Sequence, residues 1–492
     1  MVWKCMVCGH EHRGDRPPST CPVCGVGSDL FQAQGETDPT AASPVVEKLP
    51  SGQVDGFRCM VCGYIHEGPE PPDRCPVCGV GRELFQRHGE VEVLPPPTSQ
   101  AEGFKILVLG GGIGGVSAAE RIAARRPDAA VTIVSQEPGL PCFRLNLTPY
   151  LAGVEGTALT IHEKKWYDER KIRMVSGEVT HIEADAHVVT LRDGNQLPYD
   201  HLILATGSHP FVPPIPGVRR EGVFSLRTLS DAEGILRSAR GGKAVIIGGG
   251  LLGLEAAAAL ARRGCGATVL ESAPSLMPRQ LAVPAARMLE TFLEKSGVQV
   301  ISGAQVTSID GDETVGAVSL ADGRRLPADI VILAVGVRPN VFLPSLVGLR
   351  TGRGVLVDDQ MRTSIPDILA AGDVAEHRGV VWGLWTAALA QGAVAGETAA
   401  GGQAAFLGLP ASTRLKVAGL DVFSIGVFDG ADIEAREFLE ENRYLRVAVR
   451  DGVVVGANLV GDLASMGLLR EAVERRSAVA EIDDLFPKAR GV

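Results

Sequence analysis

Unbroken apolar runs that end at glycine clusters are the strongest pattern in the body of the chain. Phe104–Leu109 is such a run, and it leads through Gly110–Gly115 into a segment that we expect to be helical as far as Arg126. Val131–Val134 is typical of a second buried strand. A strand, a glycine loop, a helix and another strand in this order predict a parallel βαβ unit.

The same order returns later in the chain. Lys243–Ile247 leads through Gly248–Gly253 into an alanine-rich helix, and Ala267–Leu270 follows as a strand. Both loops fit G-x-G-x-x-G, in which the glycines permit the turn, the approach of a pyrophosphate and the packing of helix on strand. The matching glycines are Gly110, Gly112 and Gly115, then Gly248, Gly250 and Gly253. Two Rossmann-like dinucleotide-binding domains are therefore predicted, the alternative being that one of them is only structural.

An acidic residue follows the second strand of each unit. Glu137 follows the second strand of the first βαβ unit, and Glu271 follows the second strand of the second unit. A carboxylate at this position accepts hydrogen bonds from ribose hydroxyls and repels a 2′-phosphate. Because Ser272 and Ala273 offer no cation to offset that repulsion, the second unit favours NADH over NADPH.

Eight of the ten cysteines form a duplicated C-x-x-C pattern at the N-terminus. Each cysteine of the second copy follows its counterpart by 54 residues, as does Phe85 after Phe31. The two sets are Cys5, Cys8, Cys21 and Cys24, then Cys59, Cys62, Cys75 and Cys78. Four thiolates on two tight turns predict a tetrahedral site for zinc or iron, and the spacing alone leaves both metals open.

Composition narrows the class of protein. The 492 residues allow three or more domains, and a net charge of −10 argues against a nucleic-acid partner. No apolar run approaches the roughly 20 residues of a membrane span, and Met1–His10 carries no signal peptide, so we expect a cytoplasmic protein without a membrane partner and without disulfides. Stretches rich in Pro, Thr and Ser mark linkers at 34–56 and 88–103.

The cysteine modules resemble the short rubredoxin domain found at the end of rubrerythrins. The resemblance rests on Cys59 to Gly68, on Pro71 to Gly81 and on the closing Phe85, and the first copy is similar. It implies one redox-active iron in each set of four cysteines, with zinc as the alternative. Since about thirty residues bury little surface, metal binding would supply much of the folding free energy of each module.

The body of the chain resembles FAD-dependent pyridine nucleotide oxidoreductases over about 104–402. Beyond the glycine loops, the resemblance rests on Tyr199–Ser208, on Asp329–Asn340 and on Ile368–Ala375. It implies that Ala205, Thr206, Gly207, Gly372 and Asp373 bind FAD together with Glu137 and the first glycine loop, and that Gly336 and Glu271 bind NADH with the second. The aspartate would hold the ribityl chain.

The loop Pro141–Gly153 is similar to that of NADH:rubredoxin reductases and the nitrite reductase large subunit. The resemblance implies that Arg144 approaches the flavin. A C-x4-C redox pair is absent, because Cys142 is the only cysteine in this loop and Cys265 lies far away in the sequence. Cys142 is either an inert thiol or a single redox cysteine of the coenzyme A disulfide reductase kind.

Two further residues match family positions. Glu255 matches a position beside the nicotinamide, with a helix-dipole role as the alternative. Trp385 matches an aromatic residue near the flavin, with core packing as the alternative. We expect a helix at Leu384–Gly396 whose N-terminus faces the flavin.

The predicted fold is α/β, with two Rossmann-like domains, a small α+β C-terminal domain and two metal-stapled modules in front. The predicted boundaries are 1–33 and 57–87 for the modules, 104–219 with 341–402 for FAD, 220–340 for NAD and 403–492 for the cap. The parts predict an NADH:rubredoxin oxidoreductase that passes electrons through FAD to iron and on to a terminal reductase of oxygen, peroxide or nitric oxide, such as a rubrerythrin or a flavodiiron protein. The alternative is a flavin NADH oxidase or a coenzyme A-type disulfide reductase with zinc-binding interaction modules.

Overall fold

The structure is a computed structural model, and it describes residues 103–154, 158–409, 412–417, 420–440 and 442–485. Before residue 103 it describes the strands of the two modules and a few single residues between 2 and 87. The described chain divides into two compact units. Unit 1 comprises residues 1–143, 160–209 and 338–409, and unit 2 comprises 144–159, 210–337 and 410–492.

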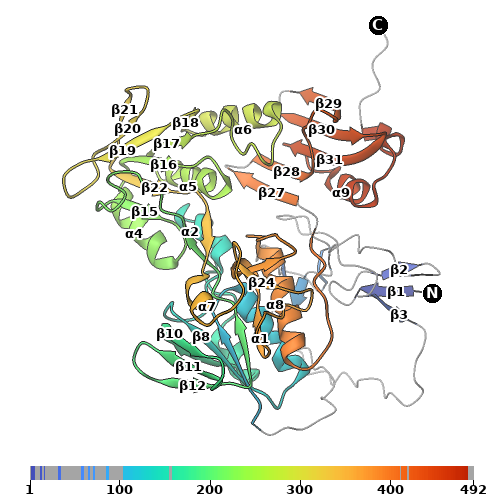
Figure 1. Ribbon diagram of the computed structural model, residues 1–492. Helices are drawn as coiled ribbons and strands as arrows, with labels where there is room; N and C mark the ends of the chain where they lie inside the picture. The colour runs from blue at the N-terminus through green and yellow to red at the C-terminus, as the bar shows by residue number, and fades with distance from the viewer. Residues whose placement is uncertain are drawn as a thin grey trace. The chain divides into compact units, whose positions relative to one another are not determined.

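The two cysteine modules have the same strand arrangement. In the first, β1 (Val2–Cys5) lies between β2 (Glu11–Arg13) and β3 (Phe31–Gln34) (Figure 1). In the second, β4 (Phe57–Cys59) lies between β5 (Ile65–His66) and β6 (Phe85–Arg87). Cys5 pairs with Phe31 and Cys59 pairs with Phe85, so the repeat found in the sequence is also a repeat of strand register.

Unit 1 is built on a parallel sheet in the order β25-β13-β7-β8-β9. Its strands are β25 (Ile368–Ala370), β13 (His201–Leu204), β7 (Lys105–Leu109), β8 (Ala130–Ser135) and β9 (Arg173–Ser176). Side chains alternate across β7, since Ile106 and Val108 enter one core cluster while Leu107 and Leu109 enter another. The second cluster is shared with the antiparallel sheet β10 (Val179–Glu183), β11 (Val188–Leu191) and β12 (Gln196–Pro198).

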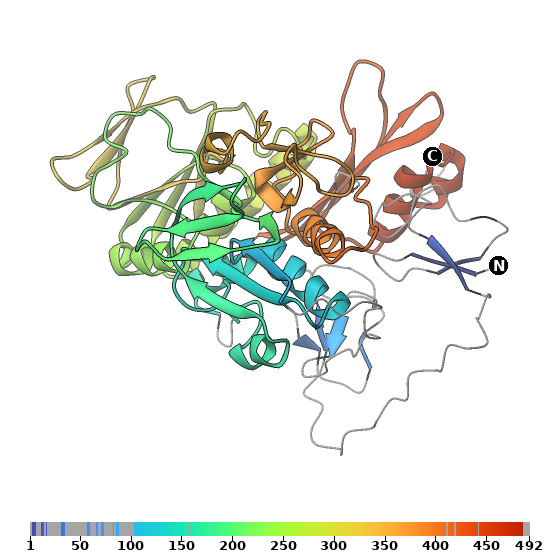
Figure 2. The same cartoon turned by 60° about the horizontal axis from the view of Figure 1, so that its bottom comes forward.

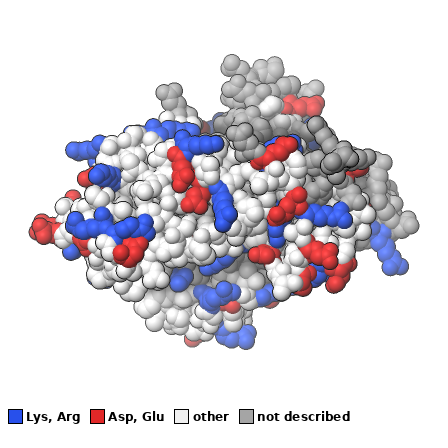
Figure 3. Space-filling view, turned by 90° about the horizontal axis from the view of Figure 1, so that it is seen from above, with Lys and Arg blue, Asp and Glu red and all other residues white. Residues whose placement is uncertain are grey.

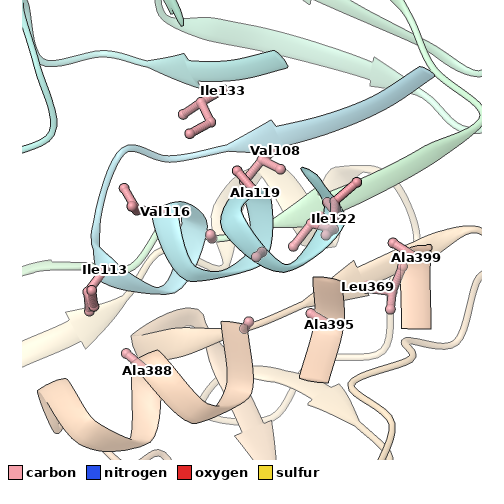
Figure 4. Packing of buried hydrophobic residues seen from close by; sticks show 14 of the residues in the cluster. Val108, Ile113, Val116, Ala119, Ile122, Ile133, Leu369, Ala388, Ala395 and Ala399 are labelled. Carbon is pink, nitrogen blue, oxygen red and sulfur yellow. The ribbon is translucent and has the colours of Figure 1, made fainter. Parts of the chain in front are cut away.

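Helices α1 (Ile113–Arg125) and α8 (Trp385–Ala399) pack on the other face of this sheet. Both views of the ribbon place orange α8 beside cyan α1 (Figure 2). In the core, α1 lies between the strands that carry Val108 and Ile133 and the helix that carries Ala388 and Ala395 (Figure 4). The two helices approach closely because a side chain at Gly392 would collide with the carbonyl of Gly114.

Unit 2 repeats this plan with the parallel order β15-β22-β16-β17-β18. The strands are β15 (Val223–Ser225), β22 (Ile330–Leu333), β16 (Lys243–Ile247), β17 (Gly266–Glu271) and β18 (Val298–Ser302), and the helices include α4 (Leu229–Ala239), α5 (Leu251–Arg262) and α6 (Val283–Lys295). An antiparallel sheet of β19 (Val306–Asp310), β20 (Ala317–Leu320) and β21 (Arg325–Pro327) shares its core. The predicted pair of Rossmann-like domains is confirmed.

The C-terminal part of unit 2 is an antiparallel sheet in the order β27-β28-β31-β30-β29. Its strands are β27 (Ser412–Val417), β28 (Leu420–Gly426), β31 (Val453–Val460), β30 (Arg443–Arg450) and β29 (Glu434–Glu440), and α9 (Met466–Arg475) packs on them. Asn458, fully buried, accepts from the amide of Ala282 at 2.7 Å and donates to the carbonyl of Gln280 at 3.0 Å, which joins this sheet to the segment before α6.

No helix among the described residues is long and apolar enough to cross a bilayer. On the face shown in Figure 3, positive and negative side chains are interspersed among neutral ones.

Candidate functional site

The first glycine loop forms a tight connection between β7 and α1. Gly110 has a φ of +120°, and a side chain there would collide with the carbonyl of Ala205. A side chain at Gly115 would collide with the carbonyl of Gly110, whereas one at Gly112, the N-cap of α1, would meet no atom within 4 Å. The loop therefore has backbone against it on two sides and open space at Gly112, as a cradle for a diphosphate requires.

The Ala205–Gly207 segment follows β13 and borders the same loop. The amide of Ala205 donates to Leu109 at 2.8 Å, and Gly207 has a φ of +68°. The carbonyl of Thr206 accepts from the Asn340 side chain at 2.7 Å. The Thr206 hydroxyl is buried and has no partner among the described residues, so it is available to a ligand.

The predicted aspartate lies in the short η4 helix (Gly372–Val374) after β25. Its carboxylate accepts a hydrogen bond from the hydroxyl of Ser208 at 2.8 Å. Gly372, with a φ of +81°, donates its amide to the side chain of Gln391 at 2.8 Å. Gly114, in the first turn of α1, faces this turn, because a Cβ there would lie 3.6 Å from Gly372 Cα. Unit 1 thus brings the first glycine loop and the Asp373 turn together.

Two other predicted residues belong to unit 1. Glu137 lies two residues beyond the end of β8 and is half-buried. Trp385 is the first residue of α8, and its ring packs against Phe143 with centroids 4.7 Å apart. The packing alternative for Trp385 is thus visible in the structure, while its role beside the flavin stays a prediction.

The second glycine loop, in unit 2, repeats the geometry of the first. Gly248 has a φ of +114°, and a side chain there would press on the carbonyl of Ala334. A side chain at Gly253 would collide with the carbonyl of Gly248, and Gly250, the N-cap of α5, again faces open space. Gly336, with a φ of +95°, follows β22 and its carbonyl accepts from Phe211 at 2.9 Å.

Glu271 is the last residue of β17 and lies beside this loop. Its carboxylate accepts hydrogen bonds from the amide of Gly249 at 2.8 Å and from the amide of Ala273 at 2.7 Å. These bonds hold the carboxylate at the edge of the loop. They also place a fixed negative charge where the second unit would meet an adenine ribose.

Glu255 lies on α5, one turn beyond the loop glycines, and is half-buried. The hydroxyl of Thr148 in α2 (Leu147–Leu151) donates to its carboxylate at 2.9 Å. Burial raises the pKa of Glu255 to about 7, although the hydrogen bond from Thr148 works in the opposite direction. The carboxyl group therefore titrates near neutral pH, as groups at functional sites often do.

Arg144 belongs to unit 2, in the η3 turn (Arg144–Asn146) ahead of α2. Its guanidinium donates to the carbonyl of Arg227, and Arg263, the C-cap of α5, donates to the carbonyl of Leu151. The η3 turn and α2 are thereby tied to the segment before α4 and to the end of α5, although the sequence places them between strands of unit 1. The approach of Arg144 to a flavin stays a prediction.

The two cysteines outside the modules lie in different units. Cys142 is half-buried in unit 1, and its backbone pairs with that of Thr160 in an isolated antiparallel β-bridge. Cys265 is buried in unit 2. In the modules, Cys5 and Cys59 end strands whose side chains are not described, and the other predicted ligands lie outside the described residues: Cys8, Cys21, Cys24, Cys62, Cys75 and Cys78. Within the described ranges no cluster of His, Cys, Asp or Glu suits a metal ion.

The residues present suit the dinucleotides that the motifs predict. Each unit has a glycine loop with open space at its helix N-cap, and unit 1 has buried polar atoms at Thr206 and Gln391 that find no partner in the part of the chain that the structure describes. Ser208, Gln391 and Thr148 were not singled out from the sequence. Ser208 directly follows the predicted Ala-Thr-Gly segment, which is a local signal, whereas the bonds made by Gln391 and Thr148 span 19 and 107 residues.

Comparison with known families agrees with the two-unit architecture. Residues 104–392 match the pyridine nucleotide-disulphide oxidoreductase family. Residues 3–32 and 57–86 each match the rubrerythrin rubredoxin-like domain, and residues 411–477 match the rubredoxin NAD+ reductase C-terminal domain. The fold and the glycine loops therefore define a flavin-dependent pyridine nucleotide oxidoreductase that carries rubredoxin-like modules.

The chain belongs to the pyridine nucleotide-disulphide oxidoreductase family, as the sequence motifs predicted. It is 30% identical over 385 residues to the NADH-rubredoxin oxidoreductase of Clostridium acetobutylicum, covering 77% of this chain and 97% of that protein. The crystal structure of NADH:rubredoxin oxidoreductase from the same organism superposes with a TM-score of 0.67, over 78% of this chain and 98% of that one, at 30% identity.

A second relative is about twice as long as the part of it that this chain matches. The NAD(P)H nitrite reductase of Bacillus subtilis is 37% identical over 387 residues, covering 77% of this chain but 48% of the relative. The chain spans about half the length of the nitrite and nitrate reductase relatives that it matches.

Proposed function

We propose that the protein is an NADH:rubredoxin oxidoreductase with its rubredoxin acceptors fused to it. NADH would reduce FAD, and the electrons would reach iron in the two cysteine modules. The observation that carries the proposal is the covalent pairing of two rubredoxin-like modules with a flavin reductase domain whose sequence lacks a C-x4-C pair. The assignments of FAD to 104–219 with 341–402, and of NADH to 220–340, belong to this proposal.

FAD, when bound, supplies the exchange between two-electron hydride chemistry and one-electron transfer. Gly110, Gly112 and Gly115 would receive its diphosphate, and Asp373, held by Ser208, would accept hydrogen bonds from its ribityl hydroxyls. Trp385 packs on Phe143 and would line the flavin side of the site.

The second glycine loop would bind NADH. Its diphosphate would lie against Gly248, Gly250 and Gly253. Glu271 is held in place by two backbone amides, so its charge would meet the adenine ribose without moving. This arrangement supports NADH as the donor over NADPH. Glu255 would lie beside the nicotinamide.

The cysteine sets would hold the metal of each module. Iron would supply one-electron exchange, whereas zinc would supply none. The downstream partner in this proposal is a terminal reductase of oxygen, peroxide or nitric oxide, such as a rubrerythrin or a flavodiiron protein.

Anaerobic stopped-flow mixing of the native-host protein with NADH tests the proposal. The flavin absorbance should bleach first and the red iron–thiolate absorbance should follow. A flavin that bleaches while the iron colour persists would contradict the electron path. Elemental analysis separates iron from colourless zinc.

A second candidate function rests on Cys142. Its half-buried thiol directly precedes Phe143, which packs on Trp385, so a thiol lies next to the predicted flavin side of the site. In that case low-molecular-weight disulfides would be the substrate and the modules would be zinc-binding docking domains. Turnover with such disulfides that is lost in Cys142→Ser would favour this candidate.

A further inference from the structure

Gln391 is a buried amide with one end bound and the other end without a partner. Its side chain is fully buried on α8, and Oε1 accepts the amide hydrogen of Gly372 at 2.8 Å. Nε2 has no partner among the described residues. Because the Gly372 amide requires an acceptor, the oxygen of the side chain must face it, and the two N–H donors must point elsewhere.

The backbone around Gln391 is held so closely that the amide is not free to withdraw. The next residue, Gly392, lies against the carbonyl of Gly114, with no room for a side chain. Gly396, one turn later, lies equally close to Ala118. These contacts fix α8 against α1, so the position of the unpartnered donor is set by the helix crossing.

The amide lies where two predicted binding elements meet. It bonds the residue directly before Asp373, and the Gly372 turn borders Gly114 in the first turn of α1. Thr206 contributes another buried polar atom without a partner in the same unit. Buried donors are rarely left unpaired in native proteins, and when they are, a ligand or ion is a common reason.

We propose that Gln391 is a residue that binds and positions FAD, with Nε2 donating to an oxygen of the ribityl-diphosphate chain while Oε1 holds the Gly372 turn. The choice of that chain follows from the two flanking elements, since the glycine loop serves a diphosphate and the aspartate serves ribityl hydroxyls. The proposal rests on the proposed FAD site and adds a residue that joins its two halves.

Two variants of the full-length protein separate ligand binding from structural support. Gln391→Glu keeps an acceptor for the Gly372 amide and removes the donor, whereas Gln391→Leu removes both. Gln196→Glu is the matched control, because Gln196 is exposed on β12 of the same unit. The FAD dissociation constant is measured at pH 8 by flavin fluorescence, and the denaturant midpoint is measured on protein stripped of FAD.

Both Gln391 variants should weaken FAD binding by about 10- to 100-fold. A carboxylate at this fully buried position has its own desolvation cost, so both stripped Gln391 variants should unfold earlier than the control. Hydrogen exchange of the Gly372 amide in the stripped protein, relative to that of the amides of α8, should accelerate only in Gln391→Leu. Wild-type FAD affinity in either Gln391 variant would overturn the proposal, and so would a Gly372 amide that exchanges as fast in Gln391→Glu as in Gln391→Leu, because loss of the turn would then explain the weaker binding. If the wild-type protein itself fails to bind FAD, the proposed function fails instead.

Discussion

The replacement Glu255→Gln tests whether a carboxyl group beside the second glycine loop titrates near neutral pH. The structure buries this carboxyl group and raises its pKa from 4.5 to about 7, with the Thr148 hydroxyl as its hydrogen-bond partner at 2.9 Å. No charged side chain is among the causes of the shift, so the desolvation of the carboxylate dominates.

The free-energy cost of ionising Glu255 in the folded protein follows from its pKa values in the unfolded and folded states. Each tenfold change in the proton equilibrium corresponds to about 1.4 kcal/mol, so a rise from 4.5 to about 7 means that the carboxylate costs at most about 3.5 kcal/mol of folding free energy. Below pH 4.5 the group is protonated in both the folded and unfolded states and costs nothing. Between pH 4.5 and 7 the unfolded chain loses its proton first, so stability falls as pH rises, and above pH 7 the full cost is present.

Infrared difference spectroscopy measures this titration directly. The neutral carboxyl band of Glu255, found as wild type minus Glu255→Gln, should disappear with a midpoint near pH 7. The stability advantage of Glu255→Gln should grow across the same window, whereas Glu313→Gln, at an exposed position of the same unit, should show no such trend. A Glu255 midpoint near pH 4.5, or a stability difference independent of pH, would refute the reasoning.

Three other replacements have expected outcomes. Glu271→Gln keeps the shape of the side chain and removes its charge, so the ratio of kcat/KM for NADPH to that for NADH should rise about tenfold in steady-state assays; an unchanged ratio would remove Glu271 from cofactor selection. Asn458→Leu leaves the buried Ala282 amide unpaired, while the Gln280 carbonyl keeps the Ser424 hydroxyl as a donor; the change should cost about 1–3 kcal/mol and speed hydrogen exchange in β31 and around Ala282; unchanged exchange would contradict that role. Cys142→Ser should leave the rate of iron reduction by NADH within about twofold of wild type, since a single-cysteine relay is not needed in the proposed path; abolition of that rate would favour the thiol mechanism.

Local patterns were enough to predict the Rossmann-like frame. The apolar run at 104–109 became β7 (Lys105–Leu109), the helix expected to end near Arg126 ends at Arg125, and the helix expected at 384–396 is α8 (Trp385–Ala399). Glycine loops carry their geometry in the sequence, because a positive φ and a close backbone approach exclude other residues. The family was predictable for the same reason.

The contacts within the candidate site were less predictable. Thr148 bonds Glu255, and Arg263 bonds Leu151, across more than 100 residues, so nothing local to 144–159 shows that it clusters with unit 2. The unpartnered donor of Gln391 is visible only once α8 lies against α1 and the Gly372 turn. Such features depend on tertiary packing and leave no periodic signal in the chain.

An anaerobic NADH titration of the native-host protein tests the central claim, that electrons pass from NADH through FAD to two iron sites on one chain. One two-electron flavin and two one-electron irons take up about four electrons, so the endpoint should lie near two NADH per chain, with loss of both the flavin and the iron–thiolate absorbance. Replacing Cys75 and Cys78 by serine should lower the endpoint to about one and a half NADH. An endpoint near one NADH for the intact protein, with the metal absorbance absent or unchanged, would contradict the account.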